Sequence, residues 1–288
     1  MPVARTNAYL STLVAVLLVA GLSTPASAQD DWIADHVSGI MQLDVTNAYF
    51  FRGIKQERHG VQIEPWAELY VNLYKSDDGL LRSASVGGGI WNSFQSERTG
   101  AVEYPQWLYE TDFYPLVALK FAGGVGLTTT YYFYTSPNGA FNTTQELNFK
   151  LNWDDSEAFG KWSMQPWVNF AIETQNTSFG THSGQGVQMG IAPTLYKTEN
   201  GSFTLTAPCE LGLAIHRYYE TASGGENTFG YGNIGLLASF PLKFIPEGAG
   251  AWTFSIGGKY YAFSETLENV NDGKSTYPVG TASLSVAF

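Results

Sequence analysis

The stretch SFTLTAPCELGLAIH, residues 202–216, alternates between two kinds of side chain. Every second position from Phe203 to Ile215 is apolar, and the positions between them are polar or small. Alternation with a period of two indicates an extended strand with one apolar face. The stretch is also long, because strands in globular proteins average about five or six residues, whereas a tilted strand needs about 9–11 residues to cross a bilayer.

The same pattern recurs along the chain, for example in VQIEPWAELYVNLY (61–74) and TTQELNFKLNW (143–153). Turns of a few residues alternate with longer polar loops, as in outer-membrane barrels. We therefore predict an all-β fold, a single transmembrane antiparallel up-and-down β-barrel of about twelve strands with both termini periplasmic. The predicted strands are 38–51, 61–75, 81–95, 106–118, 125–136, 143–154, 161–175, 185–198, 202–218, 228–243, 252–265 and 275–288.

The composition favours a membrane barrel over a soluble domain. Only 14% of residues are charged and 15% are aromatic, whereas a soluble domain carries about 25% charged residues. The net charge of −11 argues against a nucleic-acid partner. The single cysteine, Cys209, allows no intrachain disulfide. A secreted, aromatic-rich all-β domain remains the alternative.

The first 28 residues have the three parts of a secretory signal peptide. Arg5 makes the N-terminal region positively charged, LVAVLLVAGL (13–22) is a short apolar run, and ASA (26–28) is a small-residue cleavage site. We expect residues 1–28 to be removed, 29–37 to be a short periplasmic segment and 38–288 to form the barrel. The expected location is the outer membrane of a diderm bacterium.

The stretch YPVGTASLSVAF (277–288) continues the alternation to an aromatic residue. Closure of a barrel removes the sheet edges, so we expect this strand to pair with the first strand, around Ile40 to Phe51. Phe288 would then face lipid and act as the assembly signal.

In each predicted strand, every second side chain points into the lumen. The predicted lumen-facing residues are Asp44, Glu64, Glu68, Glu110, Asp112, Glu146, Lys150, Glu173, Glu210 and Lys259. Rings of acidic side chains favour cations in pores. Alternatively, these acids pair with Lys150, Lys259, Tyr and Gln side chains and fill the interior, since buried charge is costly unless it is paired.

Catalytic chemistry has little support in the sequence, and we predict no enzyme, no cofactor and no metal site. His182 has Ser183 beside it in an expected outer loop, which leaves an outer-rim hydrolase as a minor alternative. Catalysis requires a nucleophile, a base and an orienting group within mutual reach.

The stretch DVTNAYFFRGIKQ (44–56) resembles the first hairpin of the TorF-like putative porins, and GVQIEPWAELYVNLY (60–74) stands where the second strand of that family follows. The terminal aromatic residue also resembles the C-terminal signature that the barrel assembly machinery recognises. The resemblance implies an outer-membrane barrel and leaves the substrate open.

Together these features predict a narrow passive, porin-like channel for small hydrophilic solutes that are neutral or cationic. A plugged, non-conducting barrel with a structural or adhesive role is the alternative. The expected partners are outer-membrane lipids, the barrel assembly machinery and the solutes, with a homo-oligomer also possible.

Overall fold

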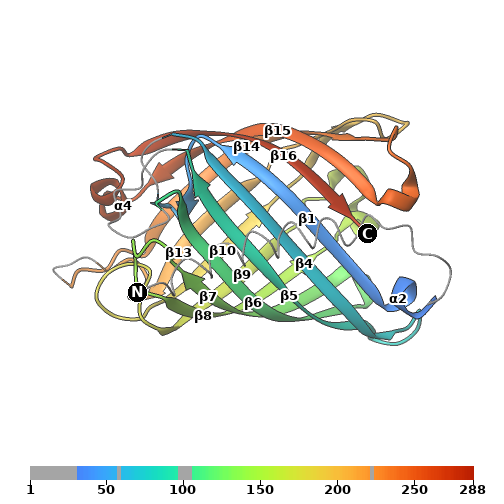
Figure 1. Ribbon diagram of the computed structural model, residues 1–288, viewed down its shortest axis with the longest axis horizontal. Coiled ribbons are helices and arrows are strands. Elements are labelled where there is room, and N and C mark those ends of the chain that lie inside the picture. The colour runs from blue at the N-terminus through green and yellow to red at the C-terminus, as the bar shows by residue number, and fades with distance from the viewer. Residues whose placement is uncertain (1–30, 57–59, 97–105, 221–223) are drawn as a thin grey trace, which may run out of the picture.

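The chain forms one closed β-barrel (Figure 1). The computed structural model describes residues 31–56, 60–96, 106–220 and 224–288. The predicted signal peptide, residues 1–28, lies outside the described residues.

The barrel strands follow one another around the sheet in sequence order, and all of their pairings are antiparallel. The strands are β1 (Val37–Thr46), β4 (Gln62–Lys75), β5 (Leu81–Gln95), β6 (Leu108–Phe121), β7 (Val125–Thr135), β8 (Thr144–Trp153), β9 (Trp167–Gln175), β10 (Gln185–Ile191), β11 (Thr194–Lys197), β12 (Thr204–Thr206), β13 (Cys209–His216), β14 (Phe229–Pro241), β15 (Ala251–Phe263) and β16 (Thr276–Ala287).

Two of the barrel strands are interrupted. Pro193 separates β10 from β11, and Pro208 separates β12 from β13. Proline has no N–H to donate to the ladder, which accounts for a break at each position. Fourteen segments therefore make twelve strands, because each interrupted pair crosses the barrel once. The predicted all-β, twelve-stranded barrel is confirmed.

Two predicted strand boundaries are wrong. The first strand ends at Thr46, and residues 47–51 leave the sheet. The strand predicted from residue 161 begins at Trp167, because α3 (Ser156–Phe159) and the 3-10 turn η2 (Gly160–Trp162) occupy the preceding turn.

The seam between β1 and β16 closes the barrel as predicted. The register runs from Ile40 opposite Ala287 to Thr46 opposite Thr281. Beyond it, the Phe288 N–H donates to the Gly39 carbonyl at 3.0 Å and the Gly39 N–H donates back at 2.9 Å. The Phe288 ring lies so close to Gly39 that a Cβ there would be 2.5 Å from Cζ of Phe288.

The two ends of the barrel differ. The Phe288 end carries α2 (Asp31–His36) and the turns that include α3, η1 (Ala122–Gly124) and η3 (Glu247–Ala249). The opposite end, called the hairpin end below, carries α4 (Glu265–Val270) and a hairpin of β2 (Phe50–Phe51) and β3 (Ile54–Lys55).

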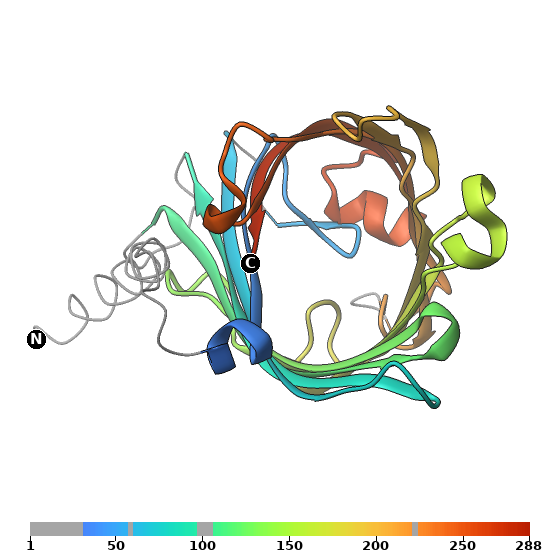
Figure 2. The same ribbon diagram turned by 90° about the vertical axis from the view of Figure 1, so that its right-hand side faces the viewer.

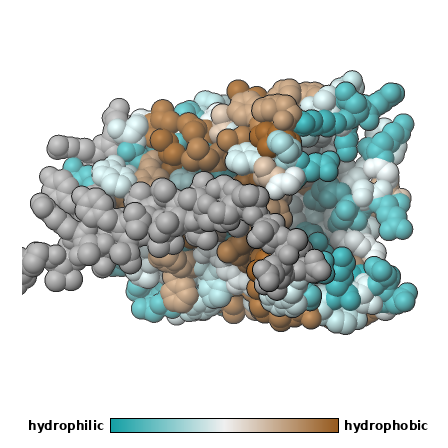
Figure 3. All heavy atoms as spheres, turned by 45° about the vertical axis from the view of Figure 1, so that its right-hand side comes forward, coloured by the Kyte–Doolittle hydropathy of each residue, from teal (hydrophilic) through white to brown (hydrophobic). Residues whose placement is uncertain are grey.

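Apolar side chains cover the outside of the barrel. The side chains that point outward from the strands include Leu43 (41% exposed), Leu151 (45%) and Ile256 (50%). Figure 3 shows apolar side chains gathered over the middle of the wall and hydrophilic ones toward one end. Large apolar side chains are thus exposed in the pattern that a lipid-facing barrel requires.

The packed hydrophobic cluster lies inside the barrel, at the hairpin end. Ile54 of β3 and Leu267 of α4 pack there against Tyr218, Tyr231 and Phe263. Figure 2, a view along the barrel, shows the hairpin and α4 within the ring of strands. The loops at this end therefore fold inward and occupy the lumen.

Candidate functional site: the lumen and its inner hairpin

The inner hairpin, residues 47–56, turns at Arg52 and Gly53. Both residues have positive φ, 48° and 81°, as a two-residue hairpin turn with a right-handed twist requires. Glycine adopts this conformation without strain, whereas Arg52 adopts it at a cost. The contacts of its side chain provide the compensation.

Arg52 reaches across the lumen to β8. Its guanidinium forms an ion pair with the Glu146 carboxylate through both terminal nitrogens, and it donates to Asn148 Oδ1 at 3.0 Å. Burial alone would lower the pKa of Arg52, but the facing Glu146 carboxylate raises it well above its usual value. A two-pronged pair of this kind fixes orientation as well as charge.

Glu146 is fully buried and is satisfied by several donors. Besides Arg52, it accepts hydrogen bonds from Tyr218 OH at 3.0 Å, Tyr134 OH at 3.1 Å and Asn148 Nδ2 at 2.6 Å. A buried carboxylate is tolerated when its lone pairs are filled in this way. The site therefore anchors the tip of the hairpin to the barrel wall.

Further contacts hold the hairpin from the side of α4. Asn271, just after α4, donates to the Gly53 carbonyl at 2.7 Å and accepts from the Lys55 N–H at 2.9 Å. Phe50 lies 5.0 Å from the ring centroid of Tyr261 and 5.3 Å from that of Tyr277. Hydrogen bonds and aromatic contacts thus fix the hairpin on two sides.

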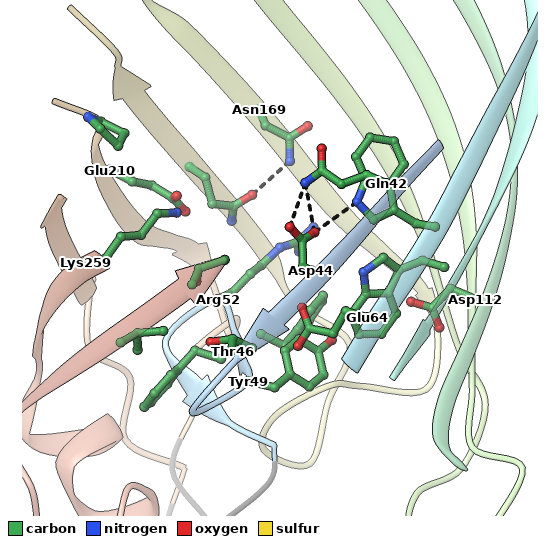
Figure 4. Close-up of a pocket in the computed structure, with 18 of the residues that line it drawn as sticks. Gln42, Asp44, Thr46, Tyr49, Arg52, Glu64, Asp112, Asn169, Glu210 and Lys259 are labelled. Carbon is green, nitrogen blue, oxygen red and sulfur yellow. Dashed lines mark hydrogen bonds between the residues drawn. The ribbon is translucent and has the colours of Figure 1, made fainter. Parts of the chain in front are cut away.

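Next to the hairpin, the lumen contains a cavity of about 830 Å³. Seven of the ten predicted lumen residues line it: Asp44, Glu64, Glu68, Asp112, Lys150, Glu210 and Lys259. Figure 4 shows Asp44, Glu64 and Asp112 on one side of this cavity and Glu210 and Lys259 on the other. The structure therefore brings most of the predicted set around one space.

The other three predicted residues are buried at the hairpin end. Glu146 binds Arg52, as described above. Glu173 accepts the backbone N–H groups of Ser178 at 2.5 Å and Gly184 at 2.7 Å, so it orders the loop after β9. Glu110 is only 4% exposed.

Two of the lumen acids accept hydrogen bonds from neutral donors. Asp44 accepts from Gln42 at 2.8 Å and Trp66 at 3.2 Å, and Glu68 accepts from Tyr114 at 3.1 Å. Within the residues that the structure describes, neither Lys150 nor Lys259 forms an ion pair with these acids. Instead, Lys150 Nζ lies 5.1 Å from the centroid of the Trp167 ring.

The His182 region shows no arrangement of a serine nucleophile with its base. His182 Nδ1 lies 2.9 Å from Glu220 Oε2, while Ser183 Oγ donates to the Asn176 carbonyl at 2.7 Å. The hydrogen bond of Glu220 with His182 lowers the pKa of Glu220. These contacts join the loop after β9 to the loop after β13.

The hairpin was not predicted as an inward element. The predicted first strand runs to residue 51 and the second begins at residue 61, which leaves residues 52–60 as a connecting loop. A signal was present, because Phe50, Phe51 and Ile54 flank the turn and would be exposed apolar residues in an outer loop.

In the described part of the chain, no group of three or more His, Cys, Asp or Glu side chains could hold a metal ion. None of the helices within the same residues is long and apolar enough to cross a membrane.

Several solved structures align with this chain at low sequence identity. No protein-family model matches the sequence, and no curated protein matches it. An outer membrane channel from Pseudomonas putida F1 aligns with a TM-score of 0.48 and 9% identity, over 88% of this chain and 95% of that chain. The NanC porin aligns with a TM-score of 0.40 and 12% identity (85% and 98% covered). Outer membrane phospholipase A from Escherichia coli aligns with a TM-score of 0.38 and 13% identity (91% and 98% covered).

Proposed function

We propose that the protein is an outer-membrane β-barrel that acts as a narrow passive channel for small hydrophilic solutes, neutral or cationic. The observation that carries this proposal is the cavity of about 830 Å³ inside the barrel, with acidic and other polar side chains along its wall. A filled barrel interior would leave no such space.

The outer surface supports a location in a membrane. Only helices and closed barrels satisfy every backbone polar group in lipid, and this sheet is closed through the pairing of β1 with β16. The exposed apolar side chains lie on the outer face of the barrel strands. In the proposed orientation, the Phe288 end faces the periplasm and the hairpin end faces outward.

The inner hairpin sets the narrow part of the proposed path. It enters the lumen from the hairpin end and is anchored on opposite walls by Arg52 and Phe50. A solute would pass between this hairpin and the acidic wall that contains Asp44 and Glu64. Acidic side chains there favour cations over anions.

Single-channel recording in a planar bilayer tests the proposal. We expect small, stable conductance steps, and a reversal potential in a salt gradient that shows preference for cations. A correctly folded barrel that gives no steps would overturn the channel function. Steps with preference for anions would leave a channel but overturn the role of the acidic wall.

One observation favours a second candidate, a plugged barrel with a structural or adhesive role. The hairpin and α4 pack together inside the hairpin end around Ile54 and Leu267, both at least 92% buried. The same recordings separate the two functions, because the plugged barrel conducts only when the hairpin is removed from the lumen.

A further inference from the structure

Three carboxylates meet in the lumen beside the base of the inner hairpin. Asp112 on β6 pairs with Trp91 on β5, and Glu110 pairs with Ser93 two positions along. Glu64 on β4 belongs to the same wall and lines the same cavity as Asp112. Asp112 is 5% exposed and Glu110 is 4% exposed.

Tyr49, at the base of the hairpin, lies over this group. Its hydroxyl is hydrogen-bonded to Glu110, and burial together with the charges of Glu110, Asp112 and Glu64 raises the pKa of Tyr49 well above its usual value. Figure 4 shows Tyr49, Glu64 and Asp112 on the same side of the cavity. The carboxylates and the hairpin thus enclose one corner of the lumen.

These carboxylates differ from the other lumen acids in their partners. Among the residues that the structure describes, Asp112 Oδ1 and Glu64 Oε1 are buried and accept no hydrogen bond. No basic side chain in the described ranges forms an ion pair with either residue. A buried carboxylate oxygen without a donor is costly, so this corner is complete only when a donor binds there.

Two basic side chains of the inner hairpin are engaged elsewhere. Arg52 is bound to Glu146, and Lys55 lies 3.4 Å from Asp272. A donor from a bound solute would complete this corner, because no side chain of the described residues supplies one to these two oxygens.

Aromatic rings define what kind of donor fits. The Tyr49 and Trp91 rings lie 5.0 Å apart at 42° to each other, and both line the cavity. Aromatic faces attract organic cations, and they attract them more strongly where water is excluded. A bare metal ion suits this corner less, because the described acids form no metal-binding group.

We propose that this corner, made of Glu64, Asp112, Tyr49 and Trp91, binds the guanidinium or ammonium group of a small organic cation. The carboxylates accept its N–H donors, and the rings contact its apolar part. The inference rests on the proposed channel function, which it narrows from hydrophilic solutes in general to organic cations that are held during passage.

The test uses the full-length folded protein and a matched pair of probes, butylguanidinium and the neutral, similarly shaped butylurea. Each probe is added during single-channel recording in KCl. We expect butylguanidinium to reduce the conductance with a saturable concentration dependence, and butylurea to have no saturable effect. Equal effects of the two probes on a conducting channel would overturn the inference and leave the channel function intact.

Substitutions locate the site. Asp112→Asn and Glu64→Gln should each weaken the block by butylguanidinium about tenfold or more, the loss of one hydrogen bond to a charged group. The matched control is Glu210→Gln on the opposite side of the cavity, where about 0.15 M salt screens charges over about 8 Å and the block should change less than about twofold. If all three variants weaken the block by butylguanidinium equally, the acids act only through the overall negative charge of the lumen, and the proposed binding site would be overturned.

A barrel that does not conduct would overturn the channel function. In that case, direct binding of the probes to the folded protein tests the cation site. Titration of the folded protein in detergent, followed by tryptophan fluorescence, should show saturation with butylguanidinium and not with butylurea. Absence of saturation would overturn the site. If Asp112→Asn fails to fold, Glu64→Gln gives the same information in both measurements.

Discussion

The guanidinium of Arg52 and the carboxylate of Glu146 form a buried ion pair across the lumen, between residues 94 positions apart in the chain. The pair ties the tip of the inner hairpin to β8. Together with the contacts of Asn271 and Phe50, the pair holds the hairpin inside the lumen.

Arg52→Ala should release the hairpin and increase the single-channel conductance. Removal of one partner leaves the Glu146 carboxylate buried without a cation, which costs about 3–5 kcal/mol of stability. Thermal unfolding and single-channel recording measure the two effects. Lys75→Ala, at an exposed position at the Phe288 end, is the control and should change neither.

The double variant Arg52→Ala with Glu146→Ala should be more stable than Arg52→Ala alone, because no unpaired charge remains buried. Additive losses in the double variant would contradict a direct interaction between the two residues.

Gly53→Ala should also displace the hairpin. Gly53 has a φ of 81°, and a Cβ there would lie 2.7 Å from atoms of the Tyr231 ring. Gly79→Ala is a matched control, because Gly79 has a φ of 80° with nothing within 4 Å of the added Cβ. Both variants bear the cost of about 1 kcal/mol for alanine at positive φ, but only Gly53→Ala should increase the conductance. Equal conductance in the two variants would show that contact with Tyr231 does not hold the hairpin.

Ile256→Arg tests the proposed position in the membrane. Ile256 is 50% exposed near the middle of β15, and arginine on the lipid face of a barrel costs about 2–4 kcal/mol at mid-membrane. Leu80→Arg, in a turn where Leu80 is 73% exposed, is the control and should cost little. Denaturant unfolding in lipid vesicles measures both. A small and equal effect of the two variants would be inconsistent with a lipid-facing belt.

Deletion of Phe288 should reduce the amount of folded barrel in the membrane more than it changes the conductance of the molecules that fold. The deletion removes two backbone hydrogen bonds at the seam and the ring that packs over Gly39. Phe244→Ala, at the same end but 82% exposed, should assemble normally. Quantification of the folded form by its shifted gel mobility measures assembly, and normal levels after the deletion would refute the predicted role.

The contact between His182 and Glu220 should make the hairpin-end loops sensitive to acid. Because the pKa of Glu220 is lowered in the folded protein, its contribution to stability is complete above the ordinary glutamate pKa of about 4.3 and is lost as the pH falls through the lowered value. Limited proteolysis with an acid-active protease should cut the loop after β9 faster at low pH. Glu220→Gln should remove this pH dependence, and an unchanged pH profile in that variant would contradict the prediction.

Period-two alternation was sufficient to predict the barrel and its closure. It works because each strand has one face toward lipid and one toward the lumen, so the pattern of residues such as Phe203 to Ile215 fixes both register and side. The breaks at Pro193 and Pro208 were less visible, since the alternation continues across them.

The inner hairpin could not be predicted in the same way. Phe50 and Phe51 continue the apolar pattern of β1, and a strand that turns into the lumen differs from one that continues only through its distant contacts with Glu146 and Asn271. Likewise, parity predicts which acids point inward but not which of them lack donors, because Tyr49, Tyr114 and Trp66 reach the acids from other strands or from the hairpin.

The contact of Asn271 with Gly53 joins residues 218 positions apart, one in the loop that follows β1 and the other in the loop that precedes β16. Such a distant pair forms late in folding, since bringing its ends together is entropically costly until the intervening strands are in place. The hairpin acquires this anchor only once the first and last strands meet. We therefore expect a barrel that has inserted but not yet closed to leak more than the finished one, so that completing the seam also narrows the mouth.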